Sequence, residues 1–357
     1  MKIIQVIPNL GIGGAEIMCE SLTYELIRKG HSVIVISLYN LNTEITARLK
    51  KNNIDIRFLN KKRGLNISVI RKLRKIIKQE NPDVVHSHLY AIKYVVLSCI
   101  FSKKTRCIHT VHNIASKETT KIGLFLNKIF FKCKKAIPVA LSKQIQKSIV
   151  EVYHLKSENV PIVYNGIDLS KCNRKTNYEI KGNVKILHIG RFMEQKNHAG
   201  LIDAFKLFHD KFPKSELQLI GDGPLREEID IKVRDYRLES CVTFMGLQKD
   251  VYNYLHDADI FVLPSLYEGM PMTLIEAMGT GLPIIATCVG GVPDMLDNVS
   301  ALLVPINTVE ITRAFEKYYT DLNLRRHHGE AALELSKKFS ASFMAEGYLK
   351  IYFSERK

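Results

Sequence analysis

Residues 259–287, DIFVLPSLYEGMPMTLIEAMGTGLPIIAT, contain the pattern that decides the fold. Two short runs rich in β-branched and aliphatic residues, at 260–263 and 284–287, enclose a stretch with helical character. Pro271 suits the first turn of that helix, which we expect to run to about Gly279. A strand, a helix and a second strand in this order predict parallel strands joined by a crossover helix.

The same alternation occurs in two series along the chain. The first series of strands is KIIQVI, VIVIS, DVVH, CIHTV and AIPVALS, and the second is KILHIG, LQLIG, VTFMG, DIFVLPS, PIIAT and ALLVP. The Asn-Gly turn within 160–169 separates them. We therefore predict an α/β protein of two Rossmann-like, doubly wound domains, 1–163 and 164–340, facing a cleft. A last helix at about 341–355, within the C-terminal segment 341–357, is expected to pack back on the first domain.

Composition places the chain among globular proteins. Of its 357 residues, 46% are hydrophobic and 25% charged, which is ordinary for that class. No apolar run approaches the roughly 20 residues that cross a bilayer. Seven scattered cysteines, none in a C-x-x-C pair, favour reduced thiols and a cytoplasmic location.

The net charge of +16 is concentrated in the first domain. Residues 1–165 contain 28 Lys and Arg against 10 Asp and Glu. Such an excess predicts an anionic partner. The sequence has no helix-turn-helix, zinc-finger or ribonucleoprotein motif, so we expect no nucleic-acid partner.

Loops that follow parallel strands are where ligands bind. In LGIGGAE (10–16), Gly11, Gly13 and Gly14 allow close approach of a ligand to the backbone. A dinucleotide fingerprint would need glycine in place of Glu16, so a dehydrogenase is disfavoured. A simple tight turn between strand and helix remains an alternative.

Two cations and two carboxylates follow strands of the second domain. Arg191 and Lys196 lie on a loop that opens a helix, which suits them to hold a diphosphate. Glu268 and Glu276 should be about 10 Å apart at about 1.5 Å per helical residue. That exceeds the roughly 5 Å separation of a retaining hydrolase's carboxylates. It fits the hexose and ribose hydroxyls of a nucleotide-sugar, with its phosphates over the helix N-terminus.

The chain resembles the retaining glycosyltransferases of family 4, which have the GT-B fold. The resemblance rests on Glu268-x7-Glu276 together with GGAE (13–16), VYNGID (163–168), GRFMEQKN (190–197), IGDGP (220–224) and FMGLQKDV (244–251), in this order. It covers nearly the whole chain.

The resemblance implies roles for individual residues. The residues expected at the reacting centre are His112, Glu268, Arg191 and Lys196. The residues expected to bind the donor are Gly13, Gly14, Arg191, Lys196, Glu268, Gly269, Met270, Pro271, Met272, Thr273 and Glu276. Glu276 would bind the ribose and Glu268 the transferred sugar. No metal and no cofactor are expected. Asp257-x-Asp259 is similar to a metal-binding D-x-D, but Asp259 opens a strand, so it is not interpreted as a metal site. Asp222 should stabilise its own turn.

Four histidines form a second group of candidates. His86, His88, His109 and His112 suggest a zinc site, but no Cys or carboxylate nearby in the sequence completes a tetrahedron. His112 is the one that the resemblance places at the active site. The other three are expected to pack or to form hydrogen bonds.

The resemblance implies a hexosyl- or N-acetylhexosaminyltransferase that uses a nucleotide-sugar, with a UDP-sugar expected. Its acceptor would be a glycan or a lipid-diphosphate-linked sugar, in capsule, exopolysaccharide or lipopolysaccharide synthesis. The alternatives are a nucleotide-sugar 2-epimerase of the same architecture and a non-catalytic sugar-binding relative.

The basic segments 70–78 and 121–135 raise the question of membrane contact. The second also contains Leu124, Phe125, Ile129, Phe130 and Phe131, so it predicts either a core-facing helix with a solvated basic face or an amphipathic helix that docks on anionic lipid. The second interpretation would make the protein peripheral on the inner face of the plasma membrane.

Overall fold

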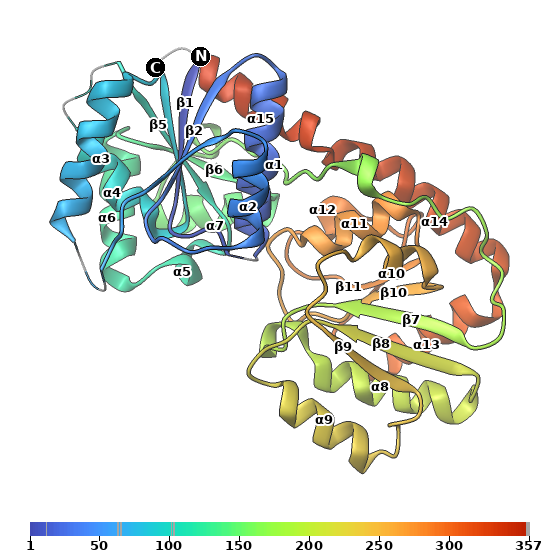
Figure 1. The fold of residues 1–357 in the computed structure, drawn as a ribbon. Coiled ribbons are helices and arrows are strands. Elements are labelled where there is room, and N and C mark those ends of the chain that lie inside the picture. The colour runs from blue at the N-terminus through green and yellow to red at the C-terminus, as the bar shows by residue number, and fades with distance from the viewer. Residues whose placement is uncertain (12, 63, 65, 101, 103, 355–357) are drawn as a thin grey trace. The chain divides into compact units, whose positions relative to one another are not determined.

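The computed structural model describes residues 1–11, 13–62, 64, 66–100, 102 and 104–354. Its internal contacts divide the chain into two compact units. Unit 1 consists of residues 1–167 together with the chain from Ala341 on, and unit 2 of Asp168–Ser340. Each unit is built on one sheet of parallel strands (Figure 1).

The sheet of unit 1 has the strand order β3-β2-β1-β4-β5-β6. The strands are β1 (Lys2–Ile7), β2 (Ser32–Ser37), β3 (Asp55–Phe58), β4 (Val84–His88), β5 (Arg106–Val111) and β6 (Ile137–Ala140). β3 was not predicted. It is a short edge strand with an exposed or half-buried surface, so it lacks the apolar run that identifies the inner strands.

The sheet of unit 2 has the order β12-β11-β10-β7-β8-β9. The strands are β7 (Val184–Ile189), β8 (Ser215–Ile220), β9 (Val242–Gly246), β10 (Ile260–Leu263), β11 (Ile284–Thr287) and β12 (Leu302–Val304). Both sheets therefore have the doubly wound order, and the predicted fold class is confirmed. The strands are parallel throughout, but the chain proceeds toward one edge of each sheet from β1 or β7 and toward the other edge from β4 or β10. Ligands bind beyond the carboxyl ends of the strand pair at which this order switches.

Helices cover both faces of each sheet (Figure 1). Those of unit 1 are α1 (Gly14–Arg28), α2 (Glu44–Lys51), α3 (Ile67–Glu80), η1 (Leu89–Ala91), α4 (Ile92–Cys99), α5 (Ala115–Glu118), α6 (Lys121–Lys132), α7 (Lys143–Tyr153), η2 (Ser157–Asn159) and α15 (Ala341–Phe353). Those of unit 2 are η3 (Leu169–Lys171), η4 (Glu194–Lys196), α8 (His198–Lys211), α9 (Arg226–Asp235), α10 (Tyr252–Asp257), α11 (Met272–Thr280), α12 (Val292–Met295), α13 (Thr308–Thr320), α14 (Leu322–Ser336) and η5 (Lys337–Phe339).

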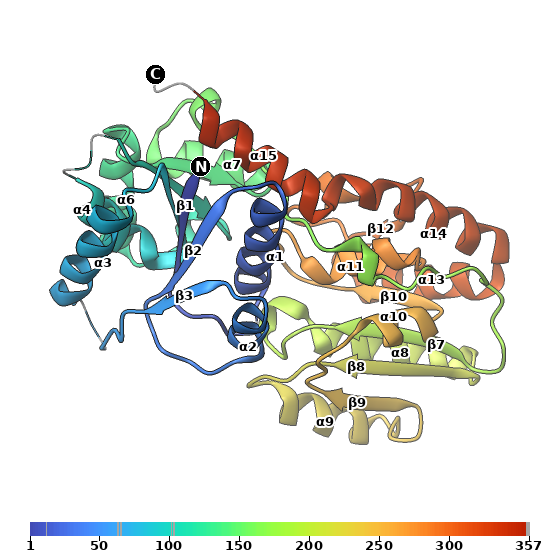
Figure 2. The ribbon, with the colours of Figure 1, turned by 45° about the horizontal axis from the view of Figure 1, so that its top comes forward.

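The helix α15 completes the core of unit 1. It lies beside α1 (Figure 2), and Met344, Tyr348 and Tyr352 pack with Ile3 and Leu22. This agrees with the expectation that the last helix packs on the first domain. The described part of the helix ends at Phe353, while residue 355, the expected end, lies outside the described residues.

Within the described residues, no helix combines the length and the apolar character that crossing a bilayer requires.

Candidate active site

Glu268 and Glu276 lie on either side of the N-terminus of α11. Glu268 is in the loop between β10 and α11 and is 4% exposed, and Glu276 is inside α11 and 8% exposed. Pro271 is the N-cap, so the helix begins at Met272, one residue later than predicted. The sequence therefore places one buried carboxylate before the helix and one within it, as expected.

The Glu268 carboxylate is fixed by two residues of η4 and by a serine of its own loop. Lys196 Nζ lies 2.6 Å from Oε1, and the Ser265 hydroxyl donates to the same oxygen at 2.6 Å. Gln195 Nε2 donates to Oε2 at 3.3 Å. A carboxylate buried at this depth needs such partners, and they hold it in one orientation.

The backbone of the Glu268 loop leaves room for no residue but glycine at position 290. Gly290 has φ +62°, and a Cβ there would lie 1.8 Å from the carbonyl oxygen of Glu268. Both the positive φ and the close approach require glycine. The segment GGVPD after β11 therefore packs directly against the loop that carries Glu268.

The N-terminus of α11 is suited to an anion. The first N–H groups of a helix have no intrahelical acceptor, and they carry the positive end of the helix dipole. The Thr273 hydroxyl in this first turn is buried and has no partner among the described residues. Gly269, Met270 and Met272 belong to the same segment, so the predicted donor-binding residues 268–273 lie together.

Arg191 follows β7, the strand that neighbours β10, and its side chain is exposed. Lys196 lies in η4 with its side chain 16% exposed. The two predicted cations thus differ: Arg191 faces solvent, while Lys196 is paired with Glu268. That pairing was not predicted from the sequence.

The environment of Glu276 opposes its ionisation. Burial, and secondarily the nearby Asp250, raise the pKa of Glu276 to about 7, while Lys171 acts in the opposite direction. A carboxylate that forms only near neutral pH can accept hydrogen bonds from the hydroxyls of a ligand once it has ionised.

Asp222 and Asp259 have structural roles in this unit. Asp222 Oδ1 accepts from the N–H of Gly223 at 2.8 Å, which stabilises its own turn as predicted. Asp259 Oδ2 accepts from the N–H of Lys185 at 2.9 Å, and Lys175 Nζ lies 3.9 Å from its other oxygen. Among the described residues, no group of three or more His, Cys, Asp and Glu side chains is arranged to hold a metal ion.

The glycines of unit 1 lie where α1 begins. Gly13 is its N-cap and Gly14 its first residue. A Cβ at Gly13 would come within 2.6 Å of Glu16 Oε2. Burial raises the pKa of Glu16, the acidic residue in this first turn.

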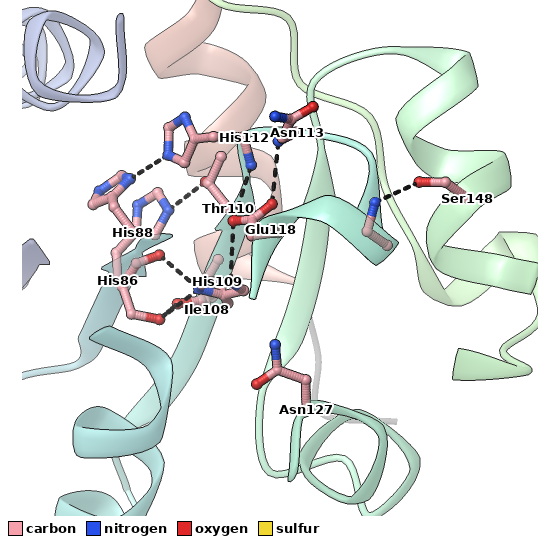
Figure 3. A network of polar contacts seen from close by, with 12 residues as sticks. His86, His88, Ile108, His109, Thr110, His112, Asn113, Glu118, Asn127 and Ser148 are labelled. Atoms are coloured by element: carbon pink, nitrogen blue, oxygen red, sulfur yellow. Dashed lines mark hydrogen bonds and ion pairs between the residues drawn. The ribbon is translucent and has the colours of Figure 1, made fainter. Parts of the chain in front are cut away.

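Each of the four histidines has a hydrogen-bonded partner, and His88 and His112 contact each other (Figure 3). His86 contacts Tyr352 Oη at 2.8 Å and Thr110 Oγ1 at 2.7 Å. His88 Nδ1 lies 3.2 Å from His112 Nε2. Burial keeps all four rings neutral, lowering the pKa of His109 and of His112 to about 3. The structure thus bears out hydrogen bonding for His86, His88 and His109, and it connects His88 to His112.

Hydrogen bonds also determine which nitrogen of His112 bears the proton. Gln5 Nε2 donates to the carbonyl oxygen of Cys19 and to the Thr23 hydroxyl, so Gln5 Oε1 faces His88. His88 Nε2 must donate to that oxygen at 3.0 Å, which leaves His88 Nδ1 as an acceptor. His112 Nε2 therefore donates to His88, and His112 Nδ1 is the acceptor nitrogen.

Glu118 holds the loop on which His112 lies. Its carboxyl oxygens accept from the N–H groups of His112 and Asn113 at 3.2 and 3.1 Å (Figure 3). His109 Nε2 is 3.9 Å from Oε1. Burial raises the pKa of Glu118 to about 8. A carboxyl group does therefore approach the histidines, which the sequence had not indicated.

Several residues around His112 in unit 1 and around Glu268 in unit 2 were missed from the sequence. Gln5 had one available signal, since it is an amide inside the buried strand KIIQVI. Gln195 had none, because its contact with Glu268 arises only from the packing of separate segments. Ser265, three residues before Glu268 in the same loop, and Glu118, six residues after His112, were near enough in the sequence to be considered and were not.

The fold and this site define a class of protein, a GT-B glycosyltransferase. The chain matches the family described as Glycosyltransferase Family 4 over residues 12–171 and the family described as Glycosyl transferases group 1 over residues 183–321. It belongs to the family 4 glycosyltransferases of group 1.

Three comparisons illustrate the relationship. An uncharacterised glycosyltransferase of Methanocaldococcus jannaschii is 32% identical over 60% of this chain and 58% of its own length. The UDP-Gal:alpha-D-GlcNAc-diphosphoundecaprenol alpha-1,3-galactosyltransferase of Escherichia coli is 27% identical over 69% of this chain and 70% of its own. The crystal structure of Anabaena HepE in complex with UDP and glucose superposes with a TM-score of 0.87 at 17% identity, covering 99% of this chain and 100% of that one.

Proposed function

We propose that the protein is a retaining glycosyltransferase that transfers a hexose or N-acetylhexosamine from a UDP-sugar to a glycan or lipid-linked acceptor. The observation that carries this proposal is the buried Glu268 carboxylate, which Lys196 and Ser265 hold beside the N-terminus of α11. A fixed acceptor of hydroxyl protons next to an anion-binding helix end suits a sugar attached to a diphosphate.

The comparisons support the choice of donor and acceptor. HepE was crystallised with UDP and glucose. The Escherichia coli relative uses UDP-galactose and an acceptor linked through a diphosphate to undecaprenol. Other relatives belong to amylovoran biosynthesis, which supports a role in the assembly of a surface polysaccharide, whether capsule, exopolysaccharide or lipopolysaccharide.

In the proposed reaction the acceptor hydroxyl attacks the anomeric carbon from the face that the diphosphate leaves. The carbon–oxygen bond to the diphosphate breaks, and the leaving oxygen takes the proton of the acceptor. Arg191 and the first N–H groups of α11 stabilise the charge that develops on the diphosphate. Lys196 orients Glu268 against the sugar, and Glu276 binds the ribose. No metal or cofactor has a role in this scheme, because these groups supply the positive charge.

The proton position on His112 fits the same scheme. With Nε2 donating to His88, Nδ1 presents a lone pair that can accept a hydrogen bond from a sugar hydroxyl. We therefore infer that His112 positions the transferred sugar rather than donating a proton to it.

Simple assays would distinguish a glycosyltransferase from the two alternative functions. A nucleotide-sugar 2-epimerase would convert the donor in the absence of any acceptor. A non-catalytic relative would bind the donor and leave it unchanged.

We further propose that α6 brings unit 1 to an anionic membrane surface. Ile122, Phe125 and Ile129 are 75%, 64% and 41% exposed, and their spacing puts them on one face of the helix. Lys121, Lys132, Lys134 and Lys135 are also exposed. Phe130 and Phe131, which the sequence grouped with the apolar face, are instead buried in the core. An exposed apolar stripe beside lysines is typical of a helix that lies in a lipid interface.

A panel of nucleotide-sugars tests the proposed function. We expect one UDP-sugar to raise the melting temperature of the protein and to lose this effect in Glu276→Ala. No stabilisation by any member of the panel would contradict the assignment of the donor site.

A further inference from the structure

A group of two lysines and three tyrosines lies at the carboxyl edge of the unit 1 sheet, apart from the histidines. Tyr39 follows β2, Lys61 follows β3, and Tyr90, Lys93 and Tyr94 follow β4. β3, β2, β1 and β4 are neighbours in the sheet. The segments that follow β2, β3 and β4 therefore lie close to the position between β1 and β4 where the strand order switches. We refer to these five residues as the Lys–Tyr cluster.

The two ammonium groups share one aromatic ring. Lys61 Nζ lies 5.9 Å and Lys93 Nζ lies 5.6 Å from the centre of the Tyr94 ring. Lys61 also lies over the Tyr39 ring and Lys93 over the Tyr90 ring, at 5.0 and 5.5 Å. Cation–π contacts of this kind bring two like charges together without neutralising either.

The cluster has no anion of its own. Lys61 is 8% exposed and, among the described residues, donates to neutral oxygens: the Tyr39 hydroxyl and the carbonyls of Lys62 and Gly64. Among the described residues, neither lysine is paired with a carboxylate. Burial, and after it the neighbouring Lys61, lower the pKa of Lys93, while Tyr39 acts in the opposite direction.

Tyr94 also brings a buried hydroxyl to this cluster. Tyr94 is 1% exposed, and its hydroxyl has no hydrogen-bond partner within the described part of the chain. A buried hydroxyl without a partner is destabilising, and a buried ammonium without a counterion is more so. One anionic ligand with several acceptor oxygens would satisfy both.

We propose that the Lys–Tyr cluster binds a phosphate or diphosphate group of the acceptor. Two cations match the charge of a diphosphate. The Tyr39 and Tyr90 hydroxyls share a hydrogen bond, so one of them and the Tyr94 hydroxyl can donate to further oxygens. This inference rests on the proposed function, since it places the acceptor on unit 1, and it names the chemistry by which that acceptor is recognised.

Binding of inorganic pyrophosphate, measured by calorimetry, tests the site directly. Lys93→Gln removes one cation and should weaken this binding on the order of tenfold to a hundredfold. Lys75→Gln, the same change at an exposed position on α3, is the matched control and should bind like the wild type. Wild-type affinity in Lys93→Gln would overturn the proposal.

Tyr94→Phe separates ligand binding from stability. It removes only the hydroxyl that has no partner, so the melting temperature of the free protein should stay the same or rise. Pyrophosphate binding should nevertheless weaken several-fold. This variant also remains informative if substitutions of the buried Lys61 prevent folding. Unchanged pyrophosphate affinity in Tyr94→Phe would show that the hydroxyl does not face the ligand and would count against the proposed site.

Arg191→Met separates this proposal from the proposed donor site, which also binds a diphosphate. We expect Arg191→Met and Lys93→Gln each to remove one of two classes of pyrophosphate site. Loss of all binding in Arg191→Met alone would overturn the cluster and leave the donor site standing. Loss of all binding in Lys93→Gln alone would overturn the diphosphate site at Arg191 and leave the Lys–Tyr cluster standing.

Two further ligands identify the source of the anion. Farnesyl diphosphate should bind at least as tightly as pyrophosphate if the group is carried by a lipid-linked acceptor, and its rejection would contradict that assignment. Glucuronate should bind weakly or not at all. Binding of glucuronate that Lys93→Gln abolishes, with pyrophosphate unaffected, would show that the cluster takes a carboxylate and would overturn the phosphate class.

Discussion

The ammonium group of Lys196 lies 2.6 Å from the carboxylate of Glu268, and both side chains are largely withdrawn from solvent, at 16% and 4% exposed. The pair joins η4, at the start of α8, to the loop before α11. A buried pair of this kind loses more when one partner is removed than when both are. Its structural and catalytic contributions can therefore be separated.

Lys196→Met should destabilise the protein by on the order of 3 kcal/mol, because it leaves the Glu268 charge buried without its partner. The double variant Lys196→Met/Glu268→Gln should recover much of this loss. Glu268→Gln alone should lower turnover far more than donor affinity. Denaturant unfolding and steady-state kinetics measure the two effects. A double variant no more stable than Lys196→Met would argue against the buried-pair explanation.

The stability of the protein should depend on the ionisation of Glu276. Since burial raises its pKa from 4.5 to about 7, the folded protein retains a proton that the unfolded chain loses between these values. The free energy of unfolding therefore falls as the pH rises from 4.5 to 7. Glu276→Gln removes this fall and should be more stable than the wild type above pH 7, by on the order of 3 kcal/mol.

Donor binding should follow the opposite trend with pH. The ionised Glu276 is the better acceptor for ribose hydroxyls, so donor affinity should increase through about pH 7 in the wild type and stay flat and weak in Glu276→Gln. Calorimetric titration with UDP at pH 6 and pH 8 measures this. Equal affinity at both pH values in the wild type would show that Glu276 does not contact the ligand.

The proton on His112 should depend on Gln5, which does not touch it. Gln5→Leu removes the oxygen that fixes His88, so His112 should become a mixture of tautomers. Nitrogen NMR of the imidazoles should show a protonated Nε2 in the wild type and exchange between forms in the variant. Turnover should fall while the KM for the donor stays nearly constant. A single Nε2-protonated form in Gln5→Leu would contradict the hydrogen-bond chain.

Activity should survive removal of divalent metal ions. Arg191 and the N-terminus of α11 supply the positive charge that a metal would otherwise provide. An assay after treatment with excess EDTA should give the untreated rate. Loss of activity that manganese or magnesium restores would mean that the diphosphate site is misassigned.

Membrane association through α6 should require both the exposed apolar residues of this helix and the lysines in and directly after it. Phe125→Asp should abolish sedimentation with phosphatidylglycerol vesicles at low salt, and so should charge reversal at Lys128, Lys132, Lys134 and Lys135. Leu207→Asp alters a comparably exposed leucine on α8 in unit 2 and serves as the control. Rising salt should release the wild type. Equal binding to phosphatidylcholine vesicles would exclude an electrostatic contribution.

Strands, helices and turns could be predicted because neighbouring residues determine them. Contacts between residues far apart in the sequence could not be predicted. Strands β7 to β12 and the placement of Glu268 before α11 follow from apolar runs and turn residues. The Lys196–Glu268 pair joins residues 72 positions apart, and the Gln5–His88 contact joins residues 83 apart. No local pattern encodes such distances. The edge strand β3 was missed because one side of it is open to solvent, so its residues need not be apolar.

The attachment of α15 affects the order in which the protein can fold during translation. Tyr352 and Tyr348 complete the buried hydrogen bonds of His86 and Thr110, more than two hundred residues earlier in the chain. The ribosome finishes every strand of unit 1 long before it makes this helix, and it releases all of unit 2 in between. Unit 2 can therefore reach its native state first, while the nascent unit 1 waits with an uncovered apolar surface. During this interval the apolar surface that α15 later covers is open to non-native contacts.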